Sequence, residues 1–166
     1  MQLLLQVYDY MPETLILSPS FPPIFQTILT ALTLVQVDIN YPALDLLRRI
    51  LAHDSLINPP GTPSAGQSNQ NTMFATAIRQ SMAEQGFQLV GLVLTGLVTY
   101  FVEDTNSLVI TIFRILADLW PNELATWLPP VLEQIPTATL SLPAKSQFLS
   151  DFGRYVMAFA YGCHLD

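Results

Sequence analysis

Histidine and cysteine are too few in this chain, and too far apart, to predict a metal site or a nucleophilic centre. His53 and His164 are separated by over a hundred positions, and Cys163 is the one thiol. A structural zinc site needs four such ligands, usually in closely spaced pairs. Adjacent side chains on a helix, such as Cys163 and His164, point about 100° apart, so neither orients the other for catalysis. We expect no metal ion and no catalytic residues.

Two other patterns resemble parts of active sites but lack what the chemistry requires. The segment from Gly61 to Ser68 has the glycine spacing of a phosphate-binding loop, but Gln67 stands where a lysine must reach the phosphates. Glu103 and Asp104 are paired acids at the start of an expected helix that Asp104 or Thr105 caps, where the helix dipole favours carboxylates and capping accounts for the pair. We expect no cofactor, and we predict that the protein is not an enzyme.

The composition favours a folded protein that does not bind nucleic acid directly. The chain has 166 residues, 51% of them hydrophobic and 11% charged, which is too apolar for a disordered protein. Its 13 acidic and 6 basic side chains give a net charge of −7, without the basic stripe that phosphate backbones require. A single cysteine excludes an internal disulfide and favours a reducing compartment.

The elements that would position any site are all predicted to be helices. Apolar residues recur at helical spacing, and no Asn-Gly or Asp-Gly turn separates alternating segments. We expect Pro22, Asn40 and Pro121 to begin helices, and Gly86 to end one with a turn. Lys145 is expected on the solvent side of the last helix. The helix at 40–53 is expected to turn Leu44, Leu47, Ile50 and Leu51 inward, and Trp127 is expected to pack between repeats. The expected helices span residues 1–10, 22–34, 40–53, 73–82, 87–101, 105–120, 121–135 and 143–161.

Alternate expected helices recur roughly every 35 to 45 residues, close to the period of HEAT and armadillo repeats. Each antiparallel pair is apolar on more than one face, so stacking successive pairs would bury those faces. We predict an all-α fold, an α-α superhelix of HEAT repeats over residues 1–166, with a flexible loop at about 54–71. A closed helical bundle is the alternative. The uncharged stretch from Gln85 to Val102 is also just long enough to span a membrane.

Five segments resemble the C-terminal end of the transportin-SR and importin-thirteen branch of the importin-β (karyopherin-β) family. In chain order they are Leu46–His53, Val102–Phe113, Trp120–Leu128, Gln134–Pro136 and Gln147–Phe152. Their order agrees with that family, and the similarity extends over nearly the whole chain. It is carried by hydrophobic spacing and a few anchor residues.

The resemblance implies a segment of a nuclear transport receptor. In this family, long HEAT solenoids bind protein cargo, pass the nucleoporins of the pore, and release cargo when the GTPase Ran binds N-terminal repeats. The chain would supply about the last four repeats, without the Ran-binding repeats or the arginine-rich helix that grips phosphorylated Arg-Ser domains. It would work in the nucleus and cytoplasm, away from nucleic acid and membranes. A general helical scaffold for other proteins is the alternative, ahead of a small membrane protein.

Charged residues expected on the inner face of the stack are the candidate protein contacts. They are Asp45, Arg48, Arg49, Glu123 and Glu133. The acid excess would steer basic cargo, including SR-type proteins, toward the surface. The four-residue spacing of Asp45 and Arg49 also predicts an ion pair within their helix.

Overall fold

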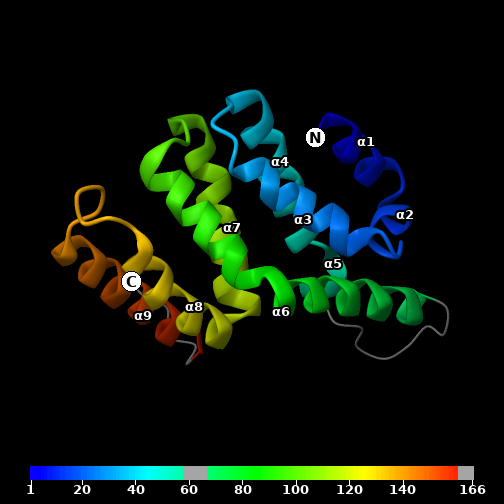
Figure 1. Cartoon of the computed structure of the whole chain (residues 1–166). Helices are drawn as coiled ribbons and strands as arrows, with labels where there is room; N and C mark the ends of the chain where they lie inside the picture. The colour runs from blue at the N-terminus through cyan, green and yellow to red at the C-terminus, as the bar shows by residue number, and fades with distance from the viewer. Residues whose placement is uncertain (58–66, 161–166) are drawn as a thin grey trace.

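The computed structural model describes residues 1–57 and 67–160, and every regular element in these ranges is a helix (Figure 1). The first five are α1 (Gln2–Tyr10), α2 (Pro12–Ile16), α3 (Phe21–Leu32), α4 (Val37–Leu51) and α5 (Asp54–Ile57). They are followed by α6 (Gln67–Thr99), the 3-10 turn η1 (Glu103–Thr105), α7 (Asn106–Leu119), α8 (Pro121–Gln134) and α9 (Leu142–Ala160). The all-α prediction is confirmed for these residues.

Prolines set several helix boundaries, because proline lacks a backbone N–H and has a fixed φ. Pro121 stands in the first turn of α8, where its missing N–H costs nothing. α7 ends at Leu119, since the residue before a proline is pushed out of the helical region. Pro136 likewise follows the end of α8. The bounds of α7, α8 and α9 agree with the sequence prediction to within one residue at each end.

The predicted turn at Gly86 is wrong, because α6 runs without interruption from Gln67 to Thr99. No proline lies in this stretch, and Gly86 keeps a helical backbone. A Cβ at this position would lie well inside van der Waals contact of the Trp127 ring on α8. The glycine therefore permits a close approach between two helices and does not end one. The predicted hairpin of residues 73–101 is a single long helix.

Three further local predictions differ from the structure. Asn40 does not cap α4, because its backbone N–H donates to the carbonyl of Gln36 at 2.9 Å and the helix already begins at Val37. The predicted loop at 54–71 is shorter, since α5 occupies its start and α6 begins at Gln67, while residues 58–66 lie outside the described ranges. At the start of α7, Thr105 is the N-cap, which is one of the two residues expected there, but no side-chain cap bond forms and Asp104 does not cap the helix.

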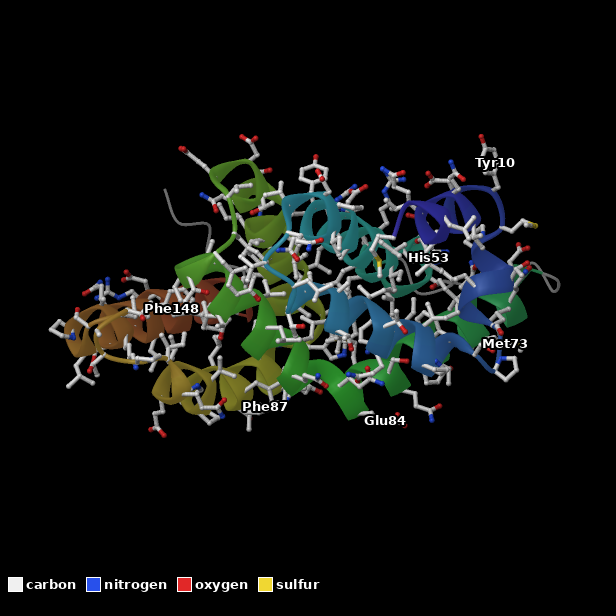
Figure 2. The ribbon with its side chains drawn as sticks, turned by 45° about the horizontal axis from the view of Figure 1, so that its top comes forward. Tyr10, His53, Met73, Glu84, Phe87 and Phe148 are labelled. Atoms are coloured by element: carbon white, nitrogen blue, oxygen red, sulfur yellow. The ribbon has the colours of Figure 1, made fainter. Side chains whose placement is uncertain are left out.

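The helices form two layers along the length of the molecule. α3, α6 and α8 pack side by side in one layer, and α1, α4, α7 and α9 follow one another in the other. Turns connect the layers, joining α3 to α4, α6 to α7, and α8 to α9. α1 and α9 lie at opposite ends of the molecule in both views (Figure 1, Figure 2). The arrangement is an open row of helix pairs.

The core lies between the two layers and is almost entirely aliphatic. Ile28 on α3, Leu47 and Ile50 on α4, Val93 on α6 and Ile112 on α7 have no exposed surface. Burying each such side chain contributes about 1.5–3 kcal/mol. The inward face predicted for α4 is confirmed, and in the described ranges no helix has the length and hydropathy that a membrane crossing requires.

Candidate protein-interaction surfaces

Three of the five candidate contact residues form an ion-paired cluster where α4 meets α1. The Asp45 carboxylate accepts hydrogen bonds from Arg48 at 2.7 Å and from Arg49 at 2.9 Å. Arg49 also donates to Asp9 of α1 at 2.5 Å, and the Tyr8 hydroxyl donates to the Arg49 backbone carbonyl at 2.8 Å. The predicted pair of Asp45 and Arg49 is confirmed. Both guanidinium groups are therefore engaged within the chain.

The environment of this cluster shifts the pKa of two of its groups. Burial acts to raise the pKa of Asp45, but the hydrogen bonds from Arg48 and Arg49 outweigh it and hold that pKa below its usual range. Burial raises the pKa of Tyr8 to about 12, against the opposing charge of Arg49. At neutral pH Asp45 is charged and Tyr8 keeps its proton, so the cluster holds α1 against α4.

The other two candidates, Glu123 and Glu133, lie on α8 in the opposite layer. Both side chains are exposed, and neither forms an ion pair with another described residue. The structure therefore does not gather the five candidates on one face. Asp45, Arg48 and Arg49 belong to one layer and Glu123 and Glu133 to the other, which makes the two glutamates the candidates that are free to meet a partner.

The joint between α6 and α8 is closely packed. Gly86 lies directly against the Trp127 ring. Val131 faces Gly91, and its Cγ2 atom lies 3.8 Å from the point where a Cβ on Gly91 would be. Leu128 and Val131 are buried along the same seam. Small residues on one helix and large ones on the other thus bring α6 and α8 close together, as the predicted packing role of Trp127 requires.

Lys145 of α9 is buried, contrary to the prediction that it faces solvent. Its ammonium group donates to the backbone carbonyl of Ile135, just beyond the end of α8. The last carbonyls of a helix lack intrahelical donors and carry the negative end of its dipole, so a cation is favoured there. The helical spacing of α9 could not reveal this bond, because it depends on how the turn from α8 folds back.

Between α7 and α9, in the other layer, the structure has an apolar groove of about 240 Å³. We call it the α7–α9 groove. Its floor and walls come from three helices, and Ile110 and Arg114 of α7 lie at its rim. The Phe148 and Phe152 rings are 6.4 Å apart at their centroids and inclined by 14°. The apolar lining residues are Leu97, Val109, Ile110, Phe113, Phe148 and Phe152.

His53 packs against an aromatic ring at the end of α4. Its ring stacks on Phe74 of α6, with centroids 4.7 Å apart and 12° between planes, and its Nδ1 lies 2.8 Å from the Ser55 hydroxyl. Burial lowers the pKa of His53, against a smaller opposing effect of Asp54. The histidine is therefore neutral at physiological pH and packs between α4 and α6.

The remaining patterns fall partly outside the described residues. Gln67 and Ser68 lie in the first turn of α6, whereas 61–66 of the phosphate-loop pattern, Cys163 and His164 are not described. Within the ranges that are described, no group of His, Cys, Asp and Glu side chains could hold a metal ion.

Comparison with known proteins yields no relative for this chain. No protein-family model, no curated protein and no solved structure matches it.

Two features of the surface were not predicted from the sequence. Arg114 received no role, although it follows Ile110 by one helical turn and interrupts an apolar stretch of α7. The groove beside it depends on how far α9 stands from α7, a tertiary distance that periodicity does not carry. The sequence signal that could have pointed to this surface is a single arginine on an otherwise apolar face of a helix.

Proposed function

We propose that this chain is a HEAT-like helical stack that binds proteins. The observation that supports this most directly is the alternation of the two layers, in which each helix packs beside the next one of its own layer. Repeat proteins use this construction, because each pair buries its apolar faces only against its neighbours and leaves long surfaces open for partners. Exposed Glu123 and Glu133 provide acidic contact points on α8.

The specific function proposed is cargo binding within a nuclear transport receptor of the importin-β type. This part rests on the sequence resemblance of the five segments. It agrees with the excess of 13 acidic over 6 basic side chains, since a negative surface attracts basic cargo. Ran would bind repeats that precede these in a complete receptor, and nucleoporins would be met during passage through the pore.

Full-length transcript sequencing tests the transport function. The expected result is an open frame upstream of Met1 that encodes further helical pairs, including an N-terminal Ran-binding region. A stop codon close upstream would refute the transport function and leave the general scaffold as the function.

Charge reversal in the complete receptor then tests the contact residues. Glu123→Lys with Glu133→Lys should weaken capture of basic cargo roughly tenfold, because rim charges steer association and the new lysines would repel a basic partner. Glu103→Lys, an exposed glutamate in η1, is the matched control and should leave capture unchanged. Equal capture by the double variant and the control would exclude α8 as the cargo surface.

A further inference from the structure

The α7–α9 groove combines an apolar interior with an unusual degree of exposure. Ile110 at its rim is 57% exposed, although isoleucine is normally among the most buried residues. Phe113, Phe148 and Phe152 are each only partly buried against the core. Figure 2 shows Phe148 on α9, at the end of the molecule away from Tyr10 and Met73. Four large apolar side chains thus meet in one open depression.

The charge at the rim of the groove is positive in a strongly acidic protein. Among the six basic residues, Arg48 and Arg49 pair with Asp45, Arg154 pairs with Asp151, and Lys145 bonds to a backbone carbonyl. Arg79 lies over the Trp120 ring, 6.0 Å from its centroid. These five cations are accounted for by contacts within the chain.

Arg114 is the sixth basic residue, and it makes no ion pair or hydrogen bond with the part of the chain that the structure describes. It is exposed and feels only the through-space attraction of Asp118, one turn along α7. An arginine beside aromatic and aliphatic side chains is typical of the centre of protein interfaces. Its guanidinium fork is free to bind a carboxylate with two hydrogen bonds.

We propose that the α7–α9 groove docks a short partner segment that carries a bulky apolar side chain next to an aspartate or glutamate. The apolar side chain enters between Phe113 and Phe148, and the carboxylate pairs with Arg114. This inference rests on the scaffold part of the proposed function and does not require the transport role. It identifies an acidic-hydrophobic partner at a surface distinct from the glutamates of α8.

The size of the groove favours a side-chain anchor over a small metabolite. Its volume of about 240 Å³ is below the roughly 300–1,000 Å³ of typical small-molecule sites. One or two side chains fill such a space, in the manner of an anchor residue at the centre of an interface. Neither an apolar side chain nor a carboxylate alone makes both contacts, so the specificity comes from pairing both features in one segment.

Selection from a displayed library of random twelve-residue peptides on the purified full chain tests this proposal. Enriched peptides should carry Phe, Leu or Trp within one helical turn of Asp or Glu. Ile110→Glu and Arg114→Glu should each weaken their binding roughly tenfold or more, and Arg114→Glu should select Lys-containing peptides instead. Ile57→Glu on α5 and Arg154→Glu on α9 replace exposed residues outside the groove lining and should leave binding unchanged.

Each remaining outcome overturns the proposal. Absence of enriched peptides, enrichment without a carboxylate, or binding that withstands both groove substitutions would each show that the groove does not bind such a segment. Dimerisation in light scattering that Ile110→Glu abolishes would assign the groove to a second copy of the chain. Circular dichroism melting of every variant confirms the fold, since substitutions at exposed positions change stability little. Upstream transcript sequence bears on the transport role alone, so failure of one proposal is separable from failure of the other.

Discussion

The α6–α7 pair meets the α8–α9 pair at two joints, one in each layer, and the two joints are packed very differently. In the first layer α6 and α8 are in close contact, with Gly86 against Trp127 and Gly91 facing Val131. In the second layer α7 and α9 leave the α7–α9 groove of about 240 Å³ between them. The same two helix pairs are therefore closed on one side and open on the other.

This difference follows from the side chains that face each joint. Glycines on α6 remove volume, so Trp127 can approach the α6 backbone, whereas large side chains such as Ile110, Phe113 and Phe148 line the space between α7 and α9. A tight joint contributes stability through packing, and an open one leaves apolar surface unburied. We infer that the α6–α8 joint stabilises the contact between the two helix pairs, whereas the α7–α9 joint leaves apolar surface open for a partner segment.

The largest expected effect comes from adding a methyl group to the closed joint. Gly86→Ala places a Cβ inside the contact distance of the Trp127 ring, which must then move. Overpacking costs roughly 1–3 kcal/mol, and the better helix propensity of alanine returns up to about 1 kcal/mol. We expect a net loss of about 1–2 kcal/mol in the free energy of unfolding, measured by urea denaturation.

Gly153 of α9 provides the matched control, because nothing lies within 4 Å of where its Cβ would be. Gly153→Ala should stabilise the protein by about 0.5–1 kcal/mol through helix propensity alone. Combining Gly86→Ala with Trp127→Leu should restore part of the loss, since the clash and the ring are removed together. Equal effects of the two alanine substitutions would mean that the α6–α8 joint is as open as the groove.

Helix periodicity was sufficient to predict the class of the fold and most of the helix ends, because apolar spacing and prolines act locally. The inward face of α4 and the bounds of α7, α8 and α9 were predicted from these signals. Helix periodicity failed at Gly86, because the glycine there is required by the Trp127 ring, 41 positions away in the sequence, and not by a turn. It failed at Asn40 because a polar residue can be buried inside a first turn.

Among the candidate contact residues, too, contacts within one helix were predictable and contacts between helices were not. The pairing of Asp45 with Arg49 was predictable from four-residue spacing within one helix, but the contact of Arg49 with Asp9 joins two helices and was not. Which layer carries Glu123 and Glu133 depends on α6 being one helix, since the predicted hairpin changes the count of helices before α8. The buried bond of Lys145, and the lack of an ion pair between Arg114 and any described residue, likewise depend on the tertiary arrangement.

A smaller effect is expected at the α1–α4 contact, which lies in the same layer as the groove. Asp45→Asn removes the carboxylate that binds both arginines, and it should cost about 1 kcal/mol, because hydrogen bonds to charged groups contribute modestly when partly solvated. The pKa of Asp45 is lowered in the folded protein, so its stabilisation is complete above the unfolded value of about 3.9 and is lost as pH falls through the folded value. The stability difference between wild type and variant, followed by thermal melting, should therefore be constant from about pH 5 to 7 and shrink below about pH 4. A difference that grows on acidification would contradict the ion-paired assignment.

The smallest expected effect is at the rim of the open joint, and it bears most directly on the difference between the joints. Arg114→Ala should change the free energy of unfolding by no more than about 0.5 kcal/mol, since the exposed guanidinium makes no hydrogen bond or ion pair with another described residue. Arg49→Ala is the comparison, because it breaks the contacts to Asp9 and Asp45 and should cost more. A loss of about 1 kcal/mol or more for Arg114→Ala in urea denaturation would make Arg114 a structural residue that holds the groove in place. A near-zero value means that folding does not require a cation at this position, which leaves Arg114 available to pair with a partner's carboxylate at the groove.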